Sequence, residues 1–86
     1  MSEPQIIAIL EKNALEEVRV ALDEFHGIDL IDIRVFADFT GTHAEKRPTK
    51  KGISLMVAKL PELIEALEKA RAEAERRGLL TADPAS

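Results

Sequence analysis

Apolar and polar residues alternate between positions 28 and 39, and this is the clearest pattern in the chain. Ile31 and Ile33 alternate with Asp32 and Arg34. A period of two places successive side chains on opposite sides of a β-strand, so this strand has one apolar face and one mixed face. Because the mixed face carries charges, we expect an antiparallel sheet that is covered on one side only.

Three further segments have strand-like patterns. Residues 18–25 alternate in the same way and reach the long strand through a tight turn at 26–29, where a glycine can take a positive φ. Residues 52–57 alternate after a polar stretch at 40–51, which we expect to form a long hairpin loop. Residues 6–10 are apolar and β-branched, and we predict a strand there, although their spacing also fits a short helical stripe.

A single helix is predicted after the last strand. Apolar residues recur there at three- and four-residue spacing: Leu60, Leu63, Ile64, Leu67, Ala70 and Ala74. Pro61 suits a first helical turn, and Gly78 is a natural stop. The sequence therefore predicts one α+β domain over residues 1–78, with a four-stranded antiparallel sheet followed by one C-terminal helix. Residues 79–86 are predicted to be a flexible tail.

The small size of the chain predicts a thin core. A domain of 86 residues buries roughly 60–65% of the surface of its unfolded chain. We expect the helix to cover one face of the sheet and a homodimer to supply the burial that one protomer lacks. Disulfides and cysteine-based zinc sites are excluded, because the chain has no cysteine.

Composition and charge narrow the class of protein further. The chain has 12 Lys and Arg against 16 Asp and Glu, for a formal charge of −4, and residues 25–60 form its only net-basic part. A general nucleic-acid coat is therefore not indicated, whereas a local anion site is compatible with this distribution. No membrane-length apolar run and no secretory signal pattern is present, so we expect a cytoplasmic protein, associated with the nucleoid if it is bacterial.

Motifs for catalysis are missing from the sequence. It contains no glycine-rich phosphate loop, nucleophile elbow or metal-ligand helix. His26 and His43 fall in turns or loops, and Asp32 beside Arg34 has the spacing of a surface ion pair. We therefore expect no enzyme activity, no metal and no cofactor.

The mixed face of the predicted sheet carries more specific chemistry. Four residues should project from it: Arg19, Phe25, Arg34 and Phe36. Four cations follow on the adjoining loop: Lys46, Arg47, Lys50 and Lys51. Exposed rings beside cations suit single-stranded nucleic acid, since bases stack on rings at about 1–3 kcal/mol each and cations hold phosphates. In the other interpretation, the rings close a dimer or a small core and the lysines form an ordinary solvated loop.

Three segments of the chain resemble a known family when they are taken together. They are Phe-His-Gly at 25–27, Leu-Ile-Asp-Ile-Arg at 30–34 and Arg-Pro-Thr-Lys-Lys-Gly-Ile-Ser-Leu at 47–55. In this order they resemble the single-stranded-DNA-binding transcriptional coactivators known as positive cofactor four, over about residues 16–68. The resemblance implies a strongly curved four-stranded sheet, a helix that contributes to a homodimer, and grooves that bind single strands largely independently of sequence.

The resemblance also implies roles for individual residues. Phe25 resembles the stacking phenylalanine of the family, and Arg34 resembles the arginine of its long strand. The basic segment corresponds to Arg47, Lys50 and Lys51. The glycine that follows this segment, Gly52, would allow close backbone approach.

The sequence departs from the family pattern after the strand arginine. An acidic residue, a tyrosine and a tryptophan are common there, whereas this chain has Val35, Phe36 and Ala37. Phe36 can replace the tyrosine, but the tryptophan is missing unless Phe39 replaces it through a bulge. We therefore take Phe36 as a further nucleic-acid-binding residue.

The sequence thus favours a small dimeric protein that binds single-stranded DNA without sequence specificity. The family resemblance suggests a coactivator role in transcription regulation, with the transcription machinery as a partner, or a role in DNA metabolism. The residues do not distinguish DNA from RNA. In the alternative hypothesis the protein is an interaction module that docks an acidic partner of the transcription machinery and does not bind DNA, which the net negative charge and the missing tryptophan favour slightly.

Overall fold

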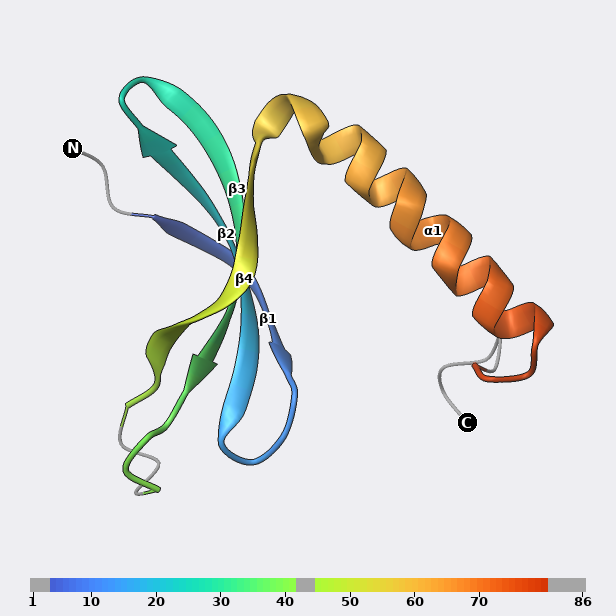
Figure 1. The fold of residues 1–86 in the computed structure, drawn as a ribbon, viewed down its shortest axis with the longest axis horizontal. Coiled ribbons are helices and arrows are strands. Elements are labelled where there is room, and N and C mark those ends of the chain that lie inside the picture. The colour runs from blue at the N-terminus through green and yellow to red at the C-terminus, as the bar shows by residue number, and fades with distance from the viewer. Residues whose placement is uncertain (1–3, 42–44, 81–86) are drawn as a thin grey trace.

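The computed structural model describes residues 4–41 and 45–80, and it confirms the α+β architecture (Figure 1). The elements follow in the order β1 (Gln5–Glu11), β2 (Glu16–Phe25), β3 (Ile28–Ala37), β4 (Arg47–Met56), the 3₁₀ turn η1 (Val57–Lys59) and α1 (Leu60–Arg76). The four strands form one antiparallel sheet in the order β1-β2-β3-β4. Of the predicted tail, residues 81–86 lie outside the described residues, as does His43.

The turn between β2 and β3 has the predicted form. Phe25 pairs with Ile28, so the loop consists of His26 and Gly27 alone. Both have a positive φ, 52° and 79°, as a two-residue type I′ turn requires. This turn fixes the register of β2 against β3, and the register decides which side chains share a face.

The core of the protomer is as thin as the composition predicts. Among the described residues, the buried apolar side chains are Ala21, Ile31 and Ala37. Four large apolar side chains of β1 are each about half exposed: Ile6, Ile7, Ile9 and Leu10. The sheet of one protomer therefore keeps much of its apolar surface in contact with solvent.

Helix α1 begins and ends where the sequence predicts. Pro61 lies in its first turn, where an unpaired backbone nitrogen has no cost. At the other end Gly78, with φ 75°, donates its N–H to the Glu75 carbonyl at 3.1 Å, and Leu79 donates to Ala74 at 2.8 Å. These two bonds form a Schellman motif, which ends a helix by satisfying its last carbonyls.

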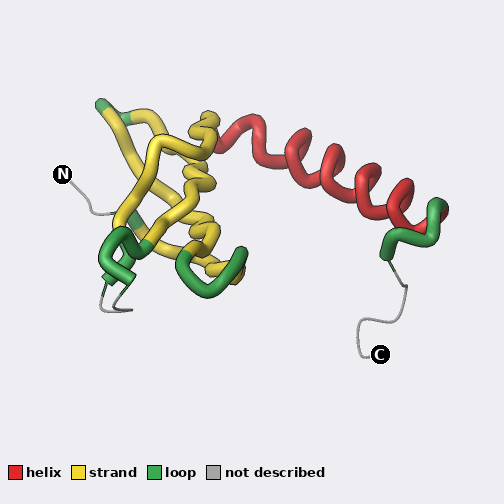
Figure 2. Tube along the Cα trace, turned by 60° about the horizontal axis from the view of Figure 1, so that its bottom comes forward, coloured by secondary structure: helices red, strands yellow, loops and turns green. Residues whose placement is uncertain are grey.

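The prediction that the helix covers one face of the sheet is wrong for the protomer. Figures 1 and 2 show α1 leaving the end of β4 and extending away from the strands. None of its side chains is buried, and Ile64 and Leu67 are 49% and 58% exposed. The periodicity correctly predicts an apolar stripe, but a period cannot specify which surface that stripe packs against.

Two predicted boundaries differ from the structure at the β3–β4 connection. Strand β3 ends at Ala37 rather than Phe39, because the next carboxylate, that of Asp38, accepts hydrogen bonds from the backbone N–H groups of Thr40 and Gly41 and bends the chain. Strand β4 begins at Arg47, so the basic segment expected on a loop lies on a strand.

Candidate nucleic-acid interface

The register of β2 and β3 gathers the predicted residues on one side of the sheet. Arg19 pairs with Arg34, and Glu17 pairs with Phe36. Directly opposed residues of an antiparallel pair share a face, and Phe25 lies on the same face at the end of β2. The side occupied by Arg19, Phe25, Arg34 and Phe36 is called the mixed face below.

The two arginines of the mixed face are each paired with an acid of the same strand. Two guanidinium nitrogens of Arg34 donate to the Asp32 carboxylate, at 3.3 Å from Nε and 3.1 Å from Nη2. Arg19 donates to Glu17, and Lys46 Nζ lies 3.7 Å from the same carboxylate. Opposed arginines on neighbouring strands would repel each other, so these acids make the pairing tolerable. They also reduce the positive charge that this part of the face offers to a phosphate.

The two predicted stacking rings have different surroundings. The guanidinium carbon of Arg19 lies 4.1 Å from the centroid of the Phe36 ring, so a cation–π contact covers one side of that ring. Phe25 is 62% exposed, and its ring forms a T-shaped pair with the ring of its neighbour His26. Phe25 is eight positions along β2 from Glu17, the partner of Phe36, so the two residues are up to roughly 26 Å apart along the strand. Phe25 is therefore the more accessible ring of the two.

An irregular pairing between β3 and β4 shapes the basic segment. Arg34 pairs with Gly52 and Phe36 pairs with Pro48, so three residues of β4 (49–51) oppose Val35 alone. Such a bulge bends the strand and changes the direction of its side chains. It explains why simple alternation did not identify residues 47–51 as a strand.

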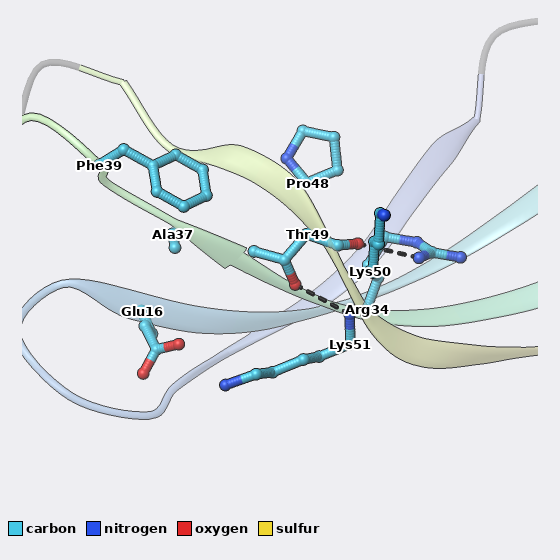
Figure 3. A pocket seen from close by; sticks show the side chains of 8 residues that line it. All are labelled: Glu16, Arg34, Ala37, Phe39, Pro48, Thr49, Lys50 and Lys51. Carbon is cyan, nitrogen blue, oxygen red and sulfur yellow. Dashed lines mark hydrogen bonds between the residues drawn. The ribbon is translucent and has the colours of Figure 1, made fainter.

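Side-chain hydrogen bonds hold this bulge (Figure 3). Thr49 Oγ1 donates to the Val35 carbonyl at 2.8 Å and accepts from the Lys51 N–H at 3.1 Å. Arg34 Nη1 donates to the Thr49 carbonyl at 3.0 Å. Arg34 thus fixes the segment that carries the lysines, in addition to lining the surface beside them.

Gly52 is required at the end of the bulge for a steric reason. A Cβ at this position would lie 2.5 Å from the Ile33 carbonyl oxygen and 2.8 Å from the Arg34 Cα, both of which belong to the backbone. No side chain fits at these distances without a shift of β3. The space beside Gly52 is therefore taken by the backbone of β3, and a contact of Gly52 with nucleic acid stays a prediction.

A groove of about 670 Å³ opens beside the bulge (Figure 3). Its lining combines cations, one ring and one acid: Glu16, Arg34, Ala37, Phe39, Pro48, Thr49, Lys50 and Lys51. Lys50, Lys51 and the nearby Arg47 are exposed, and they form no ion pair with another described residue. The free positive charge of the described chain near the mixed face is therefore concentrated at this groove.

Phe39 is the one aromatic residue in the lining of the groove, and the sequence analysis did not place it among the nucleic-acid-binding residues. It is 71% exposed, more than Phe25 or Phe36. The sequence signal was misleading, because Phe39 is the last residue of the alternating pattern and the alternation places it on the apolar face, whereas β3 ends at Ala37. Only its place near the missing tryptophan drew attention to it.

Glu16 brings a negative charge to the same groove. Hydrogen bonds from Asn13 and Lys12 lower the pKa of its carboxyl, and attraction to Lys51 lowers it further. The carboxylate is thus ionised at neutral pH and competes with an incoming phosphate for Lys51.

Two further findings concern other classes of function. Within residues 4–41 and 45–80, no group of three or more His, Cys, Asp or Glu side chains is arranged to hold a metal ion. No helix in the described part of the chain is long and apolar enough to cross a membrane.

Comparison with known proteins gives a consistent family assignment. Residues 12–66 match the model of the family described as Transcriptional Coactivator p15 (PC4). A PC4 homologue from Burkholderia pseudomallei K96243 has a similar structure, with a TM-score of 0.71 and 26% identity over 83% of this chain and 93% of that chain. No curated protein matches the chain.

Two further solved structures come from other sources. The bacteriophage T5 homologue of the eukaryotic coactivator PC4, implicated in recombination-dependent DNA replication, gives a TM-score of 0.66 and 30% identity over 86% of this chain and 83% of its own. MoSub1 in complex with single-stranded DNA gives a TM-score of 0.58 and 30% identity over 81% of this chain and 78% of its own.

The contact made by Gly52 predicts a stability effect. Gly52→Ala should lower the free energy of unfolding by about 1–3 kcal/mol, because the added Cβ overlaps backbone atoms of β3. Denaturant unfolding followed by circular dichroism measures the change. Ser54→Ala, at an exposed position of the same strand, is the matched control and should change little. A Gly52→Ala variant as stable as the parent would contradict the close strand approach.

Proposed function

The chain belongs to the PC4 family of transcriptional coactivators, and on that premise we propose that it binds single-stranded DNA without sequence specificity. The observation that carries the proposal is a set of exposed cations without a direct ion pair to another described residue: Lys50 and Lys51 line one groove beside a solvent-facing ring, and Arg47 precedes Pro48 of the same lining. MoSub1, which is 30% identical, has been crystallised with single-stranded DNA. We propose a role in transcription regulation or DNA metabolism, in the cytoplasm and at the nucleoid in a bacterial cell.

In the proposed binding mode, cations contact the phosphates and aromatic rings contact the bases. Lys50, Lys51 and Arg47 neutralise backbone phosphates, and Gly52 lets β4 pass close to β3 directly after the bulge that carries the two lysines. Phe25 stacks on a base at the other end of the mixed face. Because every base has a π-face and every nucleotide carries a phosphate, this mode tolerates any sequence. We propose that the protein acts by binding alone, without catalysis.

Arg34 has a double role in this proposal. Three of its five N–H donors serve Asp32 and the Thr49 carbonyl, which fixes the bulge that presents the lysines. The remaining two donors are left for a phosphate in the groove that Arg34 lines. A preorganised cation segment loses less conformational entropy on binding than a mobile loop would.

We further propose that the working form is a homodimer. The protomer buries few apolar side chains, and α1 leaves an apolar stripe around Ile64 and Leu67 exposed. A second copy that packs on this stripe would remove apolar surface from water at roughly 25 cal/mol per Å². A dimer would also present two grooves to DNA.

If the apolar stripe of α1 holds the dimer, replacing the stripe with charged residues should halve the mass of the protein in solution. The double variant Ile64→Glu/Leu67→Glu should sediment as a monomer of the 9.5 kDa chain, whereas the parent should have twice that mass. Glu65→Gln/Glu68→Gln changes the same helix without removing apolar surface and should remain dimeric. Equal masses for the parent and the apolar double variant would contradict a dimer held by α1.

The free lysines predict a specific salt dependence. For single strands the logarithm of the binding constant falls with the logarithm of salt concentration by about 0.7 per contacted phosphate. Lys50→Ala/Lys51→Ala removes two contacts and should weaken binding and reduce the slope by about 1.4. Fluorescence anisotropy of a labelled oligonucleotide at several salt concentrations measures both values.

A matched control makes the same change in charge elsewhere. Lys59 and Lys69 lie outside the groove and pair with Glu62 and Glu65 at 3.4 and 3.5 Å. The double alanine variant at these two positions should keep the parent slope. If both double variants bind like the parent, the assignment of phosphate contacts to the bulge is wrong.

The exposed ring of Phe25 predicts a complementary result. Phe25→Ala should weaken binding by about 1–3 kcal/mol, the cost of one lost stacked base, and should leave the salt slope unchanged. The same anisotropy titrations provide the measurement. An unchanged affinity would remove Phe25 from the interface.

A further inference from the structure

We propose that Phe39 stacks on an unpaired nucleobase, a role that the sequence pattern assigned to Phe36. This inference deepens the proposed function and rests on it. The site is the groove beside the β3–β4 bulge, and its ligand is one base of a single strand whose adjacent phosphates contact Lys50 and Lys51.

Accessibility separates the two rings. Phe39 is 71% exposed and lines the groove, whereas Phe36 is only partly exposed and has the Arg19 guanidinium 4.1 Å from its centroid. A base could stack on that side of Phe36 only by displacing Arg19 from the ring and from Glu17. Stacking on Phe39 requires no such rearrangement.

The backbone that carries Phe39 is held on both sides. Asp38 is 5% exposed, and its N–H donates to the Leu15 carbonyl at 2.9 Å. The Asp38 carboxylate accepts from the Thr40 N–H at 2.9 Å, the Thr40 hydroxyl at 2.7 Å and the Gly41 N–H at 3.0 Å. The Phe39 ring is therefore presented from a fixed turn, which lowers the entropy cost of binding a base.

The surroundings of the ring suit a nucleotide. Pro48 and the small side chain of Ala37 share the groove with Phe39, and Figure 3 shows the ring near both, with the lysines farther along β4. Alanine at position 37 leaves space where a larger residue would fill the groove. The combination offers an apolar platform for a base and free cations for its phosphates.

Tryptophan fluorescence can test this stacking directly, because the chain contains no Trp and no Tyr. In Phe39→Trp the new indole is the sole fluorophore, and its emission should be quenched saturably by oligodeoxythymidylate. The quenching should follow the same binding curve as the anisotropy of a labelled oligonucleotide. Phe36→Trp is the matched control and should show a weaker response, since Arg19 covers that ring.

Affinity gives a second, independent readout. Phe39→Ala should weaken binding about 5- to 150-fold without changing the salt slope. Phe39→Leu keeps apolar bulk but lacks the ring, and it should lose most of the same affinity while the unfolding midpoint stays at the parent value. A Phe39→Ala variant with parent affinity would overturn the inference even if the indole responds.

The outcomes separate this inference from the function on which it rests. If the anisotropy reports binding while the Phe39→Trp emission is unchanged, Phe39 is not a stacking residue and the proposed function stands. If the parent protein gives no anisotropy change with single strands at low salt, the proposed function fails and the inference fails with it.

Discussion

The arrangement of the site depends on one irregular pairing, in which three residues of β4 oppose Val35 alone. Regular pairing would alternate the side chains of β4 between two faces, whereas the bulge gathers the lysines beside one groove. The backbone bonds lost there are replaced by the Thr49 hydroxyl and the Arg34 guanidinium. Gly52 then lets β4 return to close contact with β3. The bulge explains why Thr49, Arg34 and Gly52 are needed at these positions. The bulge also produces the basic groove.

The distribution of ion pairs explains how a chain with a charge of −4 can present an anion site. On the mixed face, Asp32 neutralises Arg34 and Glu17 neutralises Arg19, so those arginines mainly organise the sheet. Lys50 and Lys51 form no direct ion pair among the described residues, although the Glu16 carboxylate attracts Lys51. Local free charge, rather than net charge, sets the attraction for phosphate within a Debye length of the surface.

Local rules were sufficient for much of the fold. Alternation identified β3 except for its end, the His26–Gly27 turn followed from its residue types, and α1 ended before Gly78 as predicted. The failures concern relations between distant residues. The start of β4 was missed because a bulge breaks the period of two, and the helix did not cover the sheet because periodicity does not identify a packing partner. The accessibility of Phe39 depends on the turn at Asp38, whose bonds no spacing rule predicts.

The central claim is that this surface binds unpaired strands in preference to paired ones. Its most direct test is a competition between single- and double-stranded oligonucleotides of equal length, measured by gel shift over a range of salt concentrations. The account predicts that the single strand binds more tightly at every salt concentration, because only unpaired bases can stack on the exposed rings. Equal affinity for both, or no shift with either, would contradict it, and the second result would favour a module that docks a protein partner.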